Sequence, residues 1–304
     1  MTPQGEFWRF VFCPAAAGTA VLVIALIVLG RQIGKSPDTW PVLGRVFVAA
    51  SLAAFGGEHL ASAQGLSQMV PSWMPFPLVT AYFVGVALFA AAASIVSGRK
   101  IRLAASLLGT MFFIFVLSIH IPRVVANHAD RFSWAVVTRD FTFGLGGWIL
   151  AASSPGDREA RWPRVIAACR IVAGLVFVFY GVEHMMHPMF VPGVPLERLM
   201  GPWVPAAHVW GHVIGLLLIA AGVLMVINVQ ARAAATWLGT ALTVTVPIIY
   251  VPMLFVAAGP AEQVVAVNYI FDSMLFAGTV FLLAGGIPPD SDRSAPARPS
   301  AALG

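Results

Sequence analysis

The chain has 304 residues, of which 59% are hydrophobic and 10% are charged. Soluble domains carry charge on about a quarter of their residues, so this composition excludes an ordinary soluble domain. The formal net charge is +5. Because the basic residues are distributed along the chain as in a membrane protein of fixed orientation, we expect no nucleic-acid partner.

Nine stretches are apolar and long enough to cross a bilayer, which takes about 20 residues in a helix. They are 11–30, 43–60, 77–97, 104–121, 134–152, 164–184, 206–227, 236–257 and 264–285. A helix satisfies its own backbone hydrogen bonds in lipid. The sequence therefore predicts an all-α, polytopic protein with about nine transmembrane helices in contact with the lipid bilayer.

The basic residues predict the orientation of these helices. Thirteen of the 18 arginines and lysines, from Arg31 to Arg298, fall on one side of the expected topology. By the positive-inside rule this side is cytoplasmic, which places the N-terminus outside and the C-terminus in the cytoplasm. We expect a multi-pass protein of the bacterial inner (plasma) membrane.

Residues 1–42 hold the first predicted helix and a short loop, and beyond them the chain looks duplicated. Residues 55–59 (FGGEH) resemble 180–184 (YGVEH), and 71–75 (PSWMP) resemble 201–205 (GPWVP). A shift of about 130 residues also aligns further positions: Gly85 with Gly215, Gly109 with Gly239, Pro122 with Pro252 and, after a two-residue adjustment, Asp140 with Asp272.

The duplication predicts two four-helix units, at 43–152 and 164–285. A cytoplasmic linker at 153–163 joins them, and a disordered cytoplasmic tail follows at 286–304. Because four helices is an even number, both units enter the membrane in the same orientation, as a parallel repeat.

All seven histidines fall on the predicted outer side, and the second unit holds most of them. His184 and His187 are three residues apart, and His208 and His212 are four apart, so each pair can share one helix face. We interpret these four as candidate metal ligands, for copper or zinc first and iron as a further option. Glu183 is a candidate ligand, partner of a ligand, or catalytic base.

The first unit has Ser62 where the second has His187, so its Glu58 and His59 are expected to be degenerate or structural. They remain weaker catalytic candidates, together with Asp272. An alternative for all the histidines is that they cap helix ends by hydrogen bonds to loop backbone.

A third interpretation is a quinone pocket, because a quinone headgroup needs a proton carrier beside an apolar channel. A histidine with a nearby carboxylate would supply the polar end, and His120 and Asp140 are among the candidate cofactor-binding residues. Tyr82 and Tyr250 could line the pocket, although an interfacial aromatic belt explains both tyrosines as well.

Charged residues near the fifth span form another candidate. Arg123 and Arg139 could form a network with Asp140, as an oxyanion site or as a structural ion pair. Asp272 has Phe271 beside it instead of an arginine, so its expected partner is Asn268 or a histidine.

Each unit has a helix ending in Gly-x-Glu-His, a loop with Trp-x-Pro and a fourth helix carrying Asp140 or Asp272. The third helix ends in HIPR (120–123) or YVPM (250–253). In these motifs, residues 43–285 resemble the DoxX/DoxD family of four-helix bacterial and archaeal membrane proteins. The resemblance implies a group that includes the small membrane subunit of a thiosulfate:quinone oxidoreductase and subunits of other membrane redox complexes. The duplication and the extra first helix depart from that pattern.

Together these features predict a quinone-linked or metal-containing membrane oxidoreductase, or its membrane subunit, with a His/Glu site at the periplasmic face. Its expected partners are a quinone and a periplasmic or membrane redox protein, and it could form an oligomer. The alternative is a non-catalytic scaffold subunit or a small-solute carrier.

Overall fold

The computed structural model describes residues 13–33, 38–154, 162–192 and 198–288. The predicted disordered tail beyond residue 288, most of the predicted linker and the first residues of the N-terminal segment lie outside this part. Within it, the secondary structure is helical apart from one antiparallel bridge between Phe190 and Leu199. The prediction of an all-α fold is confirmed.

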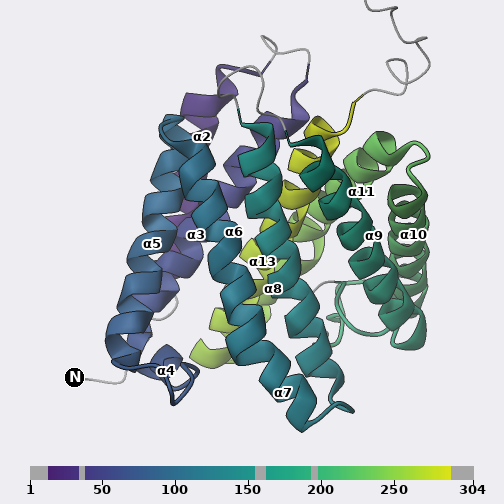
Figure 1. Ribbon diagram of the computed structural model, residues 1–304. Coiled ribbons are helices and arrows are strands. Elements are labelled where there is room, and N and C mark those ends of the chain that lie inside the picture. The colour runs from purple at the N-terminus through teal and green to yellow at the C-terminus, as the bar shows by residue number, and fades with distance from the viewer. Residues whose placement is uncertain (1–12, 34–37, 155–161, 193–197, 289–304) are drawn as a thin grey trace, which may run out of the picture.

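The helices, shown in Figure 1, follow one another in this order: α2 (Cys13–Gly30), α3 (Trp40–Ala61), α4 (Ala63–Ser67), α5 (Pro77–Ser97), α6 (Ile101–Phe115), η2 (Val116–His120), α7 (Ile121–Ala126), α8 (Arg131–Ser153), α9 (Pro163–Met186), α10 (Ala207–Ile227), α11 (Ala231–Thr245), η3 (Val246–Tyr250), α12 (Val251–Val256) and α13 (Pro260–Gly286).

In the described part of the chain, eight segments are long and apolar enough to cross a membrane, with α6 to α7 and α11 to α12 each counted as one segment. This supports a multi-pass membrane protein. The remaining predicted span, 134–152, forms α8, which is not among the eight because Arg139, Asp140 and other polar residues lower its mean hydropathy. Since α8 packs against α6, α9 and α13, its charged side chains can be held by protein instead of lipid.

The helix boundaries repeat with the predicted shift. Helices α10, α11, η3 and α12 each begin and end 130 residues after α5, α6, η2 and α7. The helix ends repeat as well: Gly98 and Asn228 both end their helices in the left-handed conformation, with φ of 77° and 60°. The division into units at 43–152 and 164–285 remains a prediction that these boundaries support.

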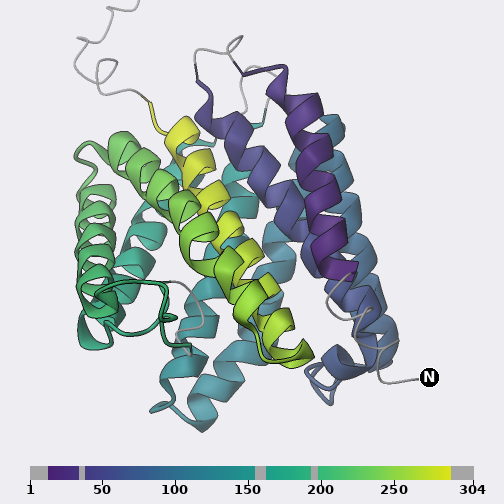
Figure 2. The same cartoon turned by 180° about the vertical axis from the view of Figure 1, so that it is seen from behind.

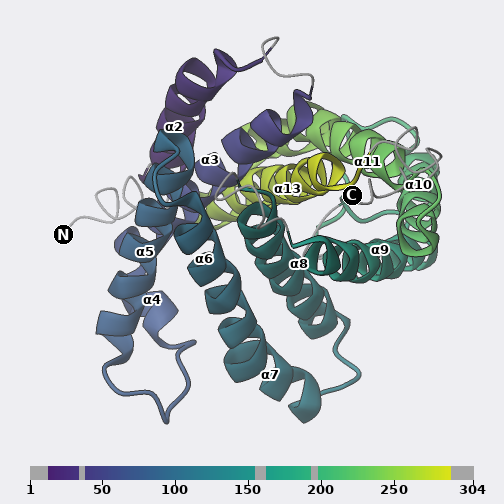
Figure 3. The same cartoon turned by 45° about the horizontal axis from the view of Figure 1, so that its top comes forward.

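The two halves meet through their fourth helices, α8 and α13. Helix α13 packs along α3 and α8, while α8 also packs against α9. Figure 3 shows α13 in the middle, with α3 and α11 on one side and α8 and α9 on the other. Figure 2 shows α2 lying against α3 at the edge of the molecule, away from α9 and α10.

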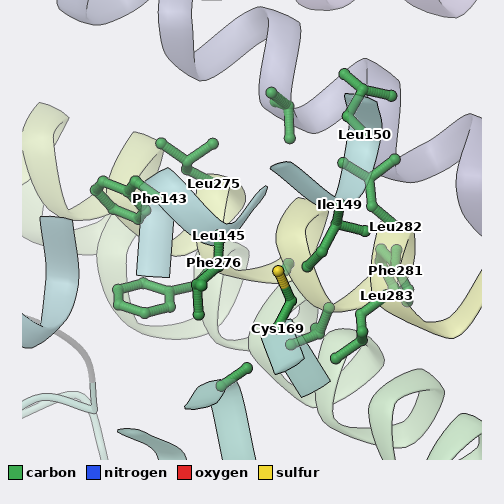
Figure 4. Close-up of a cluster of buried hydrophobic side chains, with 14 of the residues drawn as sticks. Phe143, Leu145, Ile149, Leu150, Cys169, Leu275, Phe276, Phe281, Leu282 and Leu283 are labelled. Carbon is green, nitrogen blue, oxygen red and sulfur yellow. The ribbon is translucent and has the colours of Figure 1, made fainter. Parts of the chain in front are cut away.

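The core is apolar where α8, α9 and α13 meet. Phe143, Leu145 and Ile149 of α8 face Leu275 and Phe276 of α13 in one buried cluster (Figure 4). The approach is closest at Gly146, where an added Cβ would lie 2.5 Å from Oγ1 of Thr279. Small residues let membrane helices approach in this way.

The third helix of each half contains one π-helical turn, η2 or η3, followed by Pro122 or Pro252. A proline has no backbone N–H and cannot close the usual helical hydrogen bond, and a π-helical turn is a common local adjustment. In η2 this turn carries Ser118 and His120, which line the cavity described next.

Candidate functional site in the cavity beside His120

A cavity of about 310 Å³ lies among α3, α4, α5, α6, η2, α8 and α13. We call it the His120 cavity. Most of its wall is apolar. The polar lining side chains are Glu58, His59, Thr80, Ser118, His120, Arg139, Asp140, Asn268 and Asp272.

The cavity reaches the protein surface beside α6. Its lining includes Ile114 of α6, which is 47% exposed, and Thr80 and Ala81 of α5. Met69, from the loop after α4, is 38% exposed and also lines it. Ile114 belongs to a segment that is long and apolar enough to span a membrane.

Arg139 connects the two halves of the chain beside the cavity. Its Nε lies 2.8 Å from Oδ1 of Asp140, and its Nη1 lies 3.3 Å from Oδ2 of Asp272. The carboxylates are nearly inaccessible, with side-chain exposures of 8% for Asp140 and 4% for Asp272. The network therefore joins α8 to α13 by ion pairs inside the protein.

His120 completes this network from η2. Its Nε2 lies 2.8 Å from Oδ2 of Asp140, and the ring is buried. A carboxylate only accepts hydrogen bonds, so His120 donates from Nε2 when Asp140 is ionised. Asp140 thereby orients the imidazole and fixes which nitrogen carries the proton.

The network holds two carboxylates against one guanidinium. Buried charge is costly unless it is balanced. One further proton, on His120 or on a carboxyl group, makes the set of His120, Arg139, Asp140 and Asp272 neutral.

The end of α3 supplies two more polar groups. Nδ1 of His59 donates to the carbonyl oxygen of Phe55 at 2.8 Å, because a carbonyl can only accept. Nε2 of His59 is then the other ring position available for hydrogen bonding. Glu58 accepts a hydrogen bond of 3.2 Å from Nδ2 of Asn268 in α13.

The four histidines of the second half do not form a common ligand group. No set of three or more His, Cys, Asp or Glu side chains in the described part of the chain is placed to hold a metal ion. His187 directly follows the last residue of α9, and its ring lies 6.0 Å from that of Phe190. Nδ1 of His212 donates to the carbonyl oxygen of His208 at 2.6 Å.

His184 and Glu183 lie apart from the His120 cavity lining. His184 is 1% exposed, and neither ring nitrogen has a hydrogen-bond partner within the described residues. Oε2 of Glu183 lies 3.3 Å from Nη1 of Arg131, at the start of α8. This ion pair gives Glu183 a contact between α9 and α8.

The other residues predicted for a quinone pocket lie outside the cavity lining. Tyr250 is fully buried and stacks on Tyr269, with ring centroids 5.8 Å apart. Tyr82 is 44% exposed on α5, and Arg123 is exposed on α7. Of the two arginines expected in a network with Asp140, Arg139 contacts it, whereas Arg123 lies exposed on α7.

One expected pairing needs correction. Asp272 was expected to pair with Asn268 or a histidine, but its ion-pair partner is Arg139, and Asn268 instead bonds Glu58. The contact joins residues 133 positions apart. In the sequence, an arginine inside an apolar span indicates a buried ion pair. The sequence does not show that Asp272 is the second carboxylate of this pair.

No family model, curated protein or solved structure matches this chain. The resemblance to the DoxX/DoxD family therefore stays a prediction.

Proposed function

We propose that this chain is a DoxX-like, quinone-linked membrane oxidoreductase, or the membrane subunit of one, and that the His120 cavity binds the quinone headgroup. The observation that carries the proposal is a His–Asp pair, His120 with Asp140, in the lining of a mostly apolar cavity that opens beside α6.

The shape and lining of the cavity suit such a ligand. A volume of about 310 Å³ is at the small end of the range for small-molecule sites, which is about 300–1,000 Å³. It accommodates a ring, and the opening beside Ile114 lets an isoprenoid tail extend into lipid. Phe112, Phe115 and Phe143 supply apolar ring surfaces along the wall.

The polar lining suits the proton chemistry. A quinone becomes a quinol by taking up two electrons and two protons, and the reverse reaction releases them. His120 and Asp140 would give a proton to a headgroup oxygen, or take one from it, since the cluster needs one proton for charge balance. The electrons would come from or go to a periplasmic or membrane redox partner.

We also propose an inner-membrane location with the His120 cavity on the periplasmic side. Four arginines, Arg45, Arg102, Arg170 and Arg232, contact backbone carbonyls at the opposite ends of the helices. Loop-proximal arginines of this kind mark the cytoplasmic side.

A binding titration with a matched pair of variants tests the proposal. Val84 is buried and lines the cavity, and Ile214 is its equivalent on α10, outside that lining. The purified full-length protein in detergent is titrated calorimetrically with a short-tailed ubiquinone. We expect saturable binding that is at least about tenfold weaker in Val84→Phe, because the added ring fills the cavity, and unchanged in Ile214→Phe.

Asp140→Asn separates binding from proton exchange. It keeps the shape of the side chain but removes the charge that orients His120. We expect the variant to bind the quinone about as tightly as the natural chain, while reduction of the bound quinone by a chemical reductant is at least about tenfold slower, because proton delivery to the headgroup oxygen is impaired. Absence of quinone binding by the natural chain would refute the proposal and favour the scaffold or carrier alternative. A stoichiometric metal that is lost when His184 is replaced would favour a metal-containing oxidoreductase.

A further inference from the structure

A second cavity, of about 700 Å³, lies at the opposite end of the helices from the His120 cavity. It is bounded by the first turns of α3 and α9, the last turns of α8 and α13, and the residues that follow α2. We call it the Arg45 cavity. Its polar lining consists of Gln32, Asp38, Arg45, Ser153, Ser154, Arg170 and Asn228.

Two arginines at equivalent positions face this cavity, one from each half of the chain. Nη2 of Arg45, in α3, donates to the carbonyl oxygen of Ile95 at 2.8 Å, near the end of α5. Nη1 of Arg170, in α9, donates to the carbonyl oxygens of Met225 and Val226 at the end of α10. These backbone contacts fix two guanidinium groups beside one cavity.

Buried polar atoms of the lining point to a missing hydrogen-bond acceptor. Nε of Arg45 and Oγ of Ser153 are buried, and within the described residues neither has a partner. Leaving such groups unsatisfied costs free energy. The carboxylate of Asp38 is already engaged, because its Oδ2 lies 2.5 Å from Nη2 of Arg232.

We propose that the Arg45 cavity binds a phosphate group, supplied by the headgroup of an anionic phospholipid in the leaflet at this end of the helices. Phosphate oxygens accept the fixed, charged donors of a guanidinium. Basic pockets between membrane helices are a known form of headgroup site. Val42, Ile166 and Leu282 line the same cavity and give the lipid an apolar surface that free phosphate would not use.

The test uses a pair of substitutions that differ only in charge. Ala167 is exposed and lines the cavity, so both Ala167→Asp and Ala167→Asn fit there. The full-length protein in detergent is titrated at constant ionic strength with short-chain phosphatidylglycerol, short-chain phosphatidylcholine or sodium phosphate, and the thermal unfolding midpoint is followed.

We expect phosphatidylglycerol to raise the midpoint saturably and phosphatidylcholine to raise it less. Ala167→Asp should need about tenfold more phosphatidylglycerol, the factor expected for one unfavourable charge contact, whereas Ala167→Asn should behave like the natural chain. Arg45→Gln should weaken the response similarly, and Arg99→Gln, which removes an exposed arginine outside the lining, should not.

The arms of the titration identify the source of the phosphate. A response to sodium phosphate that is lost in Ala167→Asp supports the site but assigns it to the free anion. Equal responses of Ala167→Asp and Ala167→Asn to phosphatidylglycerol would overturn the proposal, as would the absence of any response to both phosphate compounds. If Arg45→Gln fails to fold, the Ala167 pair decides alone.

Discussion

Replacing Arg139 by glutamine tests the network that joins the two halves. The change leaves Asp140 and Asp272 buried without the guanidinium that lies 2.8 Å and 3.3 Å from them. Removing one partner of a buried ion pair costs about 3–5 kcal/mol. The Arg139 side chain is 24% exposed, so water screens part of this effect and we expect a loss of about 3 kcal/mol.

The assay is reversible unfolding of the full-length protein in mixed detergent micelles, followed by circular dichroism. Arg123→Gln is the matched control, because Arg123 is exposed on α7 and outside the cavity lining; a surface charge change costs about 0.5 kcal/mol or less. Adding Asp272→Asn to Arg139→Gln should recover about 1–2 kcal/mol, since it removes one uncompensated carboxylate.

Two outcomes would contradict this account. A loss no larger for Arg139→Gln than for Arg123→Gln would mean that the buried ion pairs contribute nothing net to stability. Strict additivity of Arg139→Gln and Asp272→Asn would mean that these two side chains are not coupled across α8 and α13.

Two further predictions concern α8. Gly146→Val should destabilise the protein by about 1–3 kcal/mol in the same unfolding assay, because the side chain would overlap Thr279; Gly65→Val, where an added Cβ meets nothing within 4 Å, serves as the control for a crowding effect. The hydrogen bond from the Ser133 hydroxyl lowers the pKa of the Asp130 carboxyl, which accepts from Ser133 at the start of α8. The stability it provides is therefore complete above the ordinary carboxyl pKa and is lost as the pH falls through the lowered value. Asp130→Asn should flatten this acid-side decrease in the thermal midpoint, and an unchanged pH profile would exclude the mechanism.

The membrane helices could be predicted from the sequence because length and apolar composition determine them. The division into two units stays a prediction, which is supported by α10, α11, η3 and α12 beginning and ending 130 residues after α5, α6, η2 and α7. Among the candidate site residues predicted from the sequence, five line one cavity: Glu58, His59, His120, Asp140 and Asp272. What the sequence could not supply was that they belong together, because the contacts depend on how α8 and α13 pack.

The predicted histidine cluster shows why spacing alone is insufficient. The pairing of His184 with His187 assumes a helix through both residues, but α9 ends at Met186 and His187 has φ of −132° and ψ of 61°. Its side chain therefore leaves the helical face. His212 satisfies Nδ1 within its own helix, on the carbonyl oxygen of His208. Local backbone geometry thus separates residues that the spacing brought together.

The single guanidinium between Asp140 and Asp272 has a consequence for how the site could have arisen. Phe271 occupies in α13 the place that Arg139 occupies in α8. Two identical copies of one unit, related by symmetry, would place the same residue at both positions and give equal numbers of arginines and aspartates. A fused chain can keep arginine in one copy and phenylalanine in the other. Covalent fusion thus permits an unequal number of arginines and aspartates where α8 meets α13.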